Sequence, residues 1–130
     1  MGAAQMRYRS GLEKRTAQYL RKHKVKFEYE TLKVKWQDLR IRTYTPDFVL
    51  PNGIIIETKG RFIPSDRVKQ LMVKEQNPEL DIRFVFTNPK ARLSKLSKST
   101  YGDWCDKHGF QYAKETIPLS WIKEKRSWQC

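Results

Sequence analysis

The chain has 130 residues, 38% of them hydrophobic and 12% aromatic, so it suits one compact domain with a core, and a disordered chain is excluded. Its 27 lysines and arginines face 14 acidic residues, and the net charge of +13 predicts an anionic partner, nucleic acid before an anionic membrane. No apolar run approaches the roughly 20 residues of a membrane-spanning helix, and the N-terminus lacks the apolar core of a signal peptide, so a cytoplasmic protein is expected.

The N-terminal residues predict a basic arm followed by a helix. Residues 1–9 carry two arginines and no acid, which is typical of a short arm that contacts an anion. Ser10-Gly-Leu-Glu13 then has the spacing of a capping box, in which a serine begins a helix and a glutamate follows three residues later. We expect the helix to continue to about Lys22.

The next segment predicts two short strands. Apolar residues alternate with polar ones along residues 25–36, but their parity changes near Thr31, so a bulge or turn is expected there. Residues 37–42 are mostly polar and predict a connection or an extension of an edge strand.

A hairpin is the clearest element of the sequence. One strand is predicted over residues 44–50 and a second over residues 54–59. Pro51-Asn52-Gly53 lies between these two apolar runs, and Asn-Gly in such a place is a strong hairpin signal.

The C-terminal half alternates helices with strands. The pattern predicts a helix from Pro64 to about Gln76, a central strand from Leu80 to Thr87, a helix from about Thr100 to His108, a short strand from Phe110 to Ala113 and a short helix from Pro118 to Glu124. No repeat and no linker divides the chain. The order predicts a single α/β domain over residues 1–130, with a mixed central sheet flanked by helices.

The hairpin carries three charged residues at one end. Glu57 and Lys59 are two residues apart on a strand, so their side chains share a face. Simple pairing across the turn places Phe48 opposite Glu57, within one or two residues, and therefore brings Asp47 close to Glu57. The sequence predicts two carboxylates and an ammonium in one place.

Two carboxylates this close repel each other unless a cation lies between them. Such oxygen ligands suit Mg²⁺ or Mn²⁺, which activate water and stabilise the charge that grows on a phosphate, and the backbone carbonyl of Thr58 is a further candidate ligand. The spacing of Pro-Asp47, nine residues, Glu57-x-Lys59 matches the PD-(D/E)xK nuclease signature. That signature is short, so an ordinary salt bridge between strand ends is the alternative.

Glu13 has two readings. It is explained structurally as the third helical residue of a capping box. It is also a candidate third carboxylate that reaches the site from the first helix, and the residues alone do not decide between these roles.

Several segments together resemble one family, the endonuclease I of T-odd bacteriophages, which are Holliday junction resolvases of the PD-(D/E)xK superfamily. The similar segments run in order through nearly the whole chain: "RSGLE" (9–13), "KFEYE" (26–30), "TYTPDF" (43–48), "LPNG" (50–53), "ETKG" (57–60), "NPELDIR" (77–83), "DKHG" (106–109) and "WIKE" (121–124). This match is more specific than the nuclease signature.

The resemblance implies a structure-selective endonuclease that cuts four-way and other branched DNA with Mg²⁺, or Mn²⁺ as a substitute, at one or two ions per site. The family's catalytic residues fall on Glu13, Asp47, Glu57 and Lys59, with Glu13, Asp47, Glu57 and Thr58 as metal ligands. No small-molecule cofactor is expected. If the gene is carried by a phage, the protein acts in the host cytoplasm.

The family also implies a restriction-endonuclease-like fold and an intertwined, domain-swapped homodimer. On this basis residues 10–36 form the helix and strand that swap, 37–42 the connection, 43–124 the catalytic core and 125–130 the tail. The segment 31–42 lacks a proline that would stiffen such a bridge, which is a departure from the family pattern.

Two basic groups are predicted to contact the DNA backbone. The first lies near the presumed site and comprises Arg7, Arg9, Lys14 and Arg15; the second lies in a serine-rich connection and comprises Lys90, Arg92, Lys95 and Lys98. The alternatives are a sequence-specific or repair nuclease of the same superfamily, and a basic DNA-binding protein without catalysis.

Overall fold

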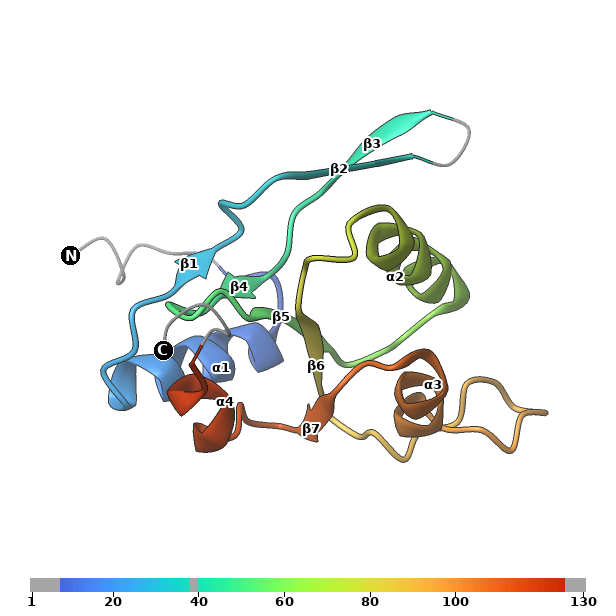
Figure 1. The fold of residues 1–130 in the computed structure, drawn as a ribbon. Helices are drawn as coiled ribbons and strands as arrows, with labels where there is room; N and C mark the ends of the chain where they lie inside the picture. Colours follow the sequence, from blue (N-terminus) through green and yellow to red (C-terminus); the bar gives the residue numbers. More distant parts are fainter. Residues whose placement is uncertain (1–7, 38–39, 126–130) are drawn as a thin grey trace.

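The computed structural model describes residues 8–37 and 40–125, and its larger sheet is mixed, with helices on both faces (Figure 1). In chain order the elements are α1 (Gly11–Lys22), β1 (Glu28–Tyr29), β2 (Val34–Gln37), β3 (Ile41–Tyr44), β4 (Phe48–Val49), β5 (Ile55–Lys59), α2 (Pro64–Gln76), β6 (Ile82–Phe86), α3 (Tyr101–His108), β7 (Tyr112–Lys114) and α4 (Leu119–Lys123). Within the described ranges, no helix is long and apolar enough to cross a membrane.

The large sheet has the strand order β1-β4-β5-β6-β7, and β2 and β3 form a separate two-stranded ribbon. The strands β1, β4 and β5 pair antiparallel, whereas β5, β6 and β7 run parallel. Alternation along β6 sends Phe84 and Phe86 toward α2 and α3, and Val85 toward α1 and α4. The predicted α/β class, with helices flanking a mixed central sheet, is confirmed.

The N-terminal elements follow the predicted pattern. The Ser10 side chain accepts a hydrogen bond from the Glu13 backbone N–H, so the helix begins where the capping signal placed it. The change of parity expected near Thr31 corresponds to a break between two strands. Glu30 adopts a left-handed backbone with φ of 53°, and after it the chain leaves the large sheet and enters the β2–β3 ribbon.

The ribbon corrects two predictions. Ile41–Tyr44, expected as connection and the start of a long strand, is β3 and pairs with β2, with Val34 opposite Tyr44. The predicted strand over residues 44–50 is wrong, because it divides into β3 and β4 around Pro46, which has no N–H to donate to a ladder. The ribbon tip, residues 38–39, lies outside the described residues.

The predicted hairpin register was wrong by one residue. Phe48 pairs with Ile56 rather than with Glu57. The Leu50 N–H donates to the Ile54 carbonyl across a three-residue loop, and Gly53 takes up the extra residue with φ of 89°. Continued by one step, this register places Asp47 directly opposite Glu57.

The C-terminal half agrees with the sequence patterns. Thr100 caps α3, and Gly109 ends it in the left-handed conformation with φ of 76°. The last strand begins at Tyr112, two residues later than the predicted Phe110.

Polar contacts fasten α4 to the rest of the domain. The amide nitrogen of Asn52, in the hairpin loop, donates to the carbonyls of Trp121 at 2.8 Å and Glu124 at 2.7 Å. Arg83, which is only 1% exposed, donates to the carboxylates of Asp81 and Glu124. The one fully buried arginine in the described core is thus neutralised by two acids.

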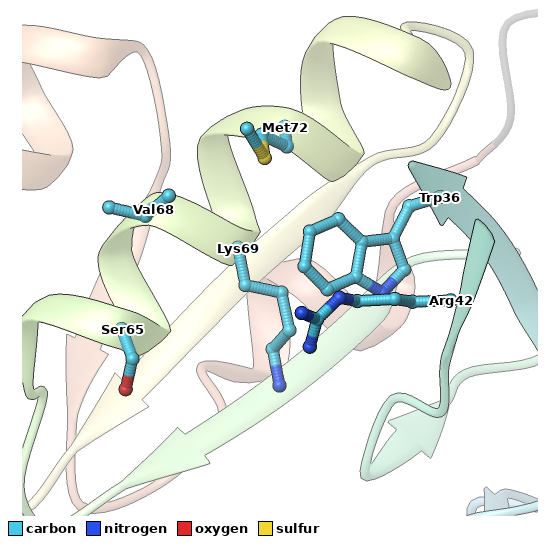
Figure 2. Close-up of a pocket in the computed structure, with 6 residues that line it drawn as sticks. All are labelled: Trp36, Arg42, Ser65, Val68, Lys69 and Met72. Atoms are coloured by element: carbon cyan, nitrogen blue, oxygen red, sulfur yellow. The ribbon is translucent and has the colours of Figure 1, made fainter. Parts of the chain in front are cut away.

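A groove of about 310 Å³ lies between the ribbon and α2 (Figure 2). Its lining residues are Trp36, Arg42, Ser65, Val68, Lys69 and Met72. None of them belongs to the charged group predicted from the sequence, so this groove is not the predicted site.

Candidate functional site

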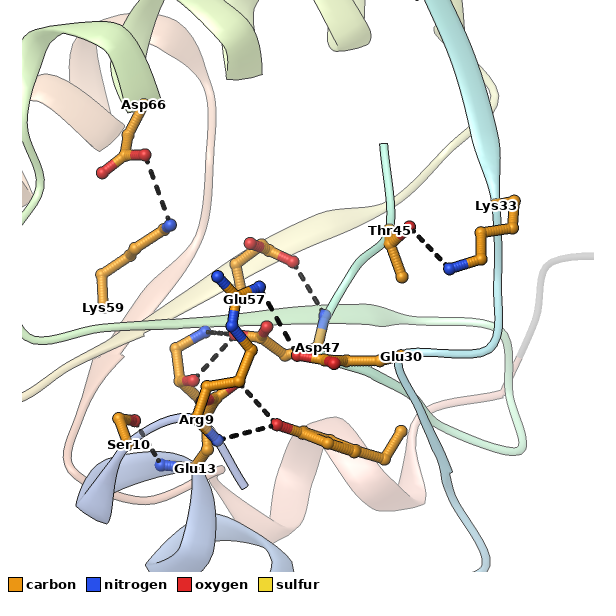
Figure 3. Close-up of polar contacts among 12 residues, drawn as sticks. Arg9, Ser10, Glu13, Glu30, Lys33, Thr45, Asp47, Glu57, Lys59 and Asp66 are labelled. Carbon is orange, nitrogen blue, oxygen red and sulfur yellow. Dashed lines mark hydrogen bonds and ion pairs between the residues drawn. The ribbon is translucent and has the colours of Figure 1, made fainter. Parts of the chain in front are cut away.

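The predicted carboxylates meet where the first turn of α1 lies against β4 and β5. Glu13, Asp47 and Glu57 are 5%, 9% and 3% exposed, respectively, so all three are buried acids. Figure 3 shows Asp47 lying between Glu13 and Glu57. The structure therefore brings together the helix and hairpin acids that the sequence nominated, within a single chain.

Asp47 is held rigidly by its neighbours on the hairpin. Its backbone N–H donates to Glu57 Oε2 at 2.9 Å. Its own Oδ2 accepts hydrogen bonds from the Thr58 N–H at 2.9 Å and from the Thr58 hydroxyl at 2.8 Å. Thr58 thus orients the Asp47 carboxylate through two donors, which leaves Oδ1 to face another group. The use of the Thr58 carbonyl as a ligand remains a prediction.

Glu13 contributes its backbone to the helix cap and its side chain to the acidic group. Its backbone N–H serves the cap, while its carboxylate Oε2 accepts a hydrogen bond from the Tyr29 hydroxyl at 3.1 Å. Burial and then the Asp47 carboxylate raise the pKa of Glu13 from 4.5 to about 7. The side chain therefore lies in the acidic group, which favours the second of its two readings.

Glu57 is the most strongly perturbed acid of the site. Burial, followed by the charge of Asp47, raises the pKa of its carboxyl from 4.5 to about 8, although Lys59 opposes the rise. Proton retention near neutral pH is the expected response of carboxylates that are buried together without a cation. A bound cation would remove that need.

Lys59 shares the Glu57 face of β5, as predicted, but is paired elsewhere. Its Nζ lies 3.5 Å from Oδ1 of Asp66 in the first turn of α2, and its side chain is 20% exposed. Asp66 was not among the predicted site residues. The sequence offered one signal for Asp66, its place in the first turn of the helix that follows the strand carrying Lys59.

Glu30 is a second acid that the sequence analysis missed. One carboxylate oxygen each from Glu13, Glu30 and Asp47 lie within 4.8 Å of one another. Oxygen atoms of this kind are the ligands that Mg²⁺ and Mn²⁺ prefer, so the donor set fits a hard divalent cation. The alternating segment that contains Glu30 pointed to a strand but not to its position beside Asp47.

The basic residues near the site form two exposed groups. Arg9, Lys14 and Arg15 are exposed around the start of α1, whereas Arg7 lies outside the described residues. Lys90, Arg92, Lys95 and Lys98 are exposed on the loop that follows β6. That loop leaves the sheet next to Lys59, because the Thr87 N–H donates to the Lys59 carbonyl. Contact of either group with DNA remains a prediction.

Comparisons with known proteins agree with this arrangement. The family model described as phage endonuclease I matches residues 1–129. "Endonuclease I" of Escherichia phage T7 is 48% identical over 120 residues, which are 92% of this chain and 80% of the relative. "Endodeoxyribonuclease 1" of Enterobacteria phage T3 is 45% identical over 120 residues, which are 92% of this chain and 79% of that protein. By this coverage and identity, the chain belongs to the phage endonuclease I family.

Proposed function

We propose that the protein is a metal-dependent endodeoxyribonuclease that resolves four-way junctions and cuts other branched DNA. The observation that carries the proposal is the buried acidic group of Glu13, Asp47 and Glu57, next to Lys59, in a member of the phage endonuclease I family. The curated relatives are named as an endonuclease and an endodeoxyribonuclease, which supports DNA hydrolysis. Branched DNA is the substrate class that the resemblance implies.

The acids would hold Mg²⁺, or Mn²⁺ in its place, as one or two ions per site. Asp47 lies between the other two acids, so it would be a ligand together with either of them, and the Thr58 carbonyl is the candidate further ligand. Such an ion lowers the pKa of bound water and stabilises negative charge on the phosphate. The net reaction is attack of a water oxygen on phosphorus with cleavage of the bond to the 3′ oxygen, which leaves a 5′-phosphate.

Lys59 would act on the phosphate side of this site. In the described chain its ammonium is paired with Asp66 at the partly exposed rim. A DNA phosphate that enters there would compete with Asp66 for the ammonium, and Lys59 would then neutralise charge or help to position the water. The exposed basic groups on both sides would hold the flanking backbone without reading bases.

An intertwined homodimer is part of the proposal. In the described chain α1 and β1 pack against the same chain's β5 and β4. Along the sequence, the β2–β3 ribbon lies between β1 and β4. Exchange of residues 10–36 between two chains would preserve these contacts and would give each site a Glu13 from the partner. Co-refolded Glu13→Ala and Asp47→Ala chains test this, because only a swapped heterodimer regains one intact site; no recovered cleavage would refute the swap.

The test of function compares a four-way junction that cannot branch-migrate with a linear duplex of the same sequence, both with Mg²⁺. Preferential cutting of the junction is expected, and equal cutting of both would favour a sequence-specific or repair nuclease. Asp47→Ala should abolish cleavage while junction binding persists. If wild type and Asp47→Ala are equally inactive with and without Mg²⁺, the protein is a DNA-binding protein without catalysis.

A further inference from the structure

We propose that Tyr44 and Gln70 are positioning residues, which hold the Glu57 carboxylate in the orientation of a metal ligand. In this arrangement the Gln70 amide donates to the Tyr44 hydroxyl, and the hydroxyl donates to Glu57. The inference rests on the proposed function, which it deepens by assigning two residues outside the nuclease signature. Neither residue touches the metal ion or the DNA, because both act through Glu57.

The spacing of α2 against β5 places Gln70 level with Glu57. Lys59 Nζ lies 3.5 Å from Oδ1 of Asp66, a pair that Figure 3 shows, so the first turn of α2 meets the end of β5. The helix then runs back along the strand, because it joins β5 to its parallel neighbour β6. Two residues of a strand and four of a helix both cover about 6–7 Å. One such step back from the Lys59 pair therefore brings Gln70 to the height of Glu57.

Tyr44 approaches the same two residues from the ribbon. It ends β3 three residues before Asp47 and is 2% exposed. Its ring packs in the core cluster that contains Ile55, the residue before Glu57 on the same face of β5. Burial and then the charge of Glu57 raise the pKa of the Tyr44 hydroxyl, whereas the Gln70 side chain lowers it. The hydroxyl is therefore a proton donor close to both side chains.

Three polar atoms of this group are buried without a well-formed hydrogen bond. Gln70 is 0% exposed, and among the described residues both its amide nitrogen and its amide oxygen lack a partner. The Tyr44 hydroxyl lacks one as well. Burial of an amide and a hydroxyl in this state is costly, and apolar side chains of the same shape would give a more stable core. The polar atoms therefore indicate a role in the neighbouring site.

That role follows from how the site orients its carboxylates. Asp47 Oδ2 accepts hydrogen bonds from two donors of Thr58. Glu57 Oε2 accepts one hydrogen bond, from the Asp47 N–H at 2.9 Å. The Tyr44 hydroxyl supplies Glu57 with a second donor, and Gln70 holds that hydroxyl in turn. Such supporting hydrogen bonds fix the orientation of metal ligands and raise the affinity for the ion.

The experiment measures two quantities for each variant. The first is Mn²⁺ binding to DNA-free protein, by calorimetry and by electron paramagnetic resonance of the free ion, and the second is urea unfolding in EDTA. Tyr44→Phe removes only the hydroxyl, and Gln70→Met keeps the length and helix preference of the side chain. We expect each to weaken Mn²⁺ binding about 10–100-fold. Each should unfold at an unchanged or higher urea concentration, because buried polar atoms without partners are removed.

The two directions separate positioning from packing, since a loss of packing would lower the stability of the metal-free protein. The double variant should bind Mn²⁺ no more weakly than Tyr44→Phe, because Gln70 acts through that hydroxyl. Tyr101→Phe is the matched control. Tyr101 is partly buried against the same core cluster, and its variant should bind Mn²⁺ as wild type does.

Wild-type affinity for Mn²⁺ in Tyr44→Phe would overturn the inference, even if the protein cuts junctions as proposed. Equal weakening in Tyr101→Phe, additive losses in the double variant, or weaker binding accompanied by lower stability would overturn it as well. If Tyr44→Phe binds Mn²⁺ weakly but wild type cuts no DNA, the proposed function alone is refuted. A wild type that binds no Mn²⁺ would overturn both.

Discussion

Glu57→Gln is expected to stabilise the metal-free protein at alkaline pH. Folding raises the pKa of this carboxyl from 4.5 to about 8, chiefly through burial. The folded chain thus holds a proton that the unfolded chain has lost, so the free energy of unfolding falls as pH rises through this window. At about 1.36 kcal/mol per pH unit the full effect is bounded by about 5 kcal/mol. The charge of Asp47 contributes to the shift, so we expect about 2–3 kcal/mol from Glu57 itself.

Glutamine removes the charge but keeps the acceptor for the Asp47 N–H. Urea unfolding in EDTA at about pH 5 and about pH 8.5 measures the effect. Wild type should lose stability between these values, whereas the variant should lose less, since among the described acids only Glu13 still has a raised pKa there, and it should exceed wild type at the higher pH. Exposed Glu79→Gln is the control and should follow wild type. A variant that is less stable than wild type at about pH 8.5 would refute the reasoning, because ionised Glu57 would then not destabilise the folded chain.

Three further substitutions test contacts and backbone geometry that hold the domain together. Arg83→Met should cost about 1–3 kcal/mol in urea unfolding, since the partners Asp81 and Glu124 are about half exposed and regain water; no loss would show that the buried pair is neutral. Asn52→Ala should cost about 1–2 kcal/mol and increase amide exchange in α4, because two hydrogen bonds to that segment are removed. Gly109→Ala should lower the melting temperature by a few degrees, about 1 kcal/mol for a left-handed residue, and an unchanged melting temperature would contradict the assigned φ of 76°.

The sequence predicted most of the helices because their ends carry local signals. Ser10 begins α1, and Gly109 ends α3, where the capping patterns placed them. Local patterns did not determine strand pairing. The hairpin register depended on how Gly53 absorbs one residue, and the β2–β3 ribbon depended on contacts between segments that each look irregular alone.

The residues of the candidate site were likewise only partly predictable from the sequence. Asp47, Glu57 and Lys59 could be grouped from strand alternation and a turn, and Glu13 from the resemblance to a family. Glu30 could not, because its position depends on a left-handed backbone at one residue and on the pairing of β1 with β4. Neither feature has a periodic signature in the sequence.

The way in which buried charge is neutralised elsewhere in this domain supports the proposal that the acidic group binds a cation. Where a buried charge supports the fold, as at Arg83, two carboxylates neutralise it at hydrogen-bond distance. The acids around Asp47 lack any such partner among the described residues: Lys59 is paired with Asp66, and Arg9 lies 3.8 Å from Oε2 of Glu30, beyond hydrogen-bond distance. A chain with a net charge of +13 has ample cations for this purpose. The lack of a basic side chain at hydrogen-bond distance from these acids therefore supports the proposal that a metal ion binds there, because a metal ion brings more charge and open coordination sites to a phosphate than a side chain can.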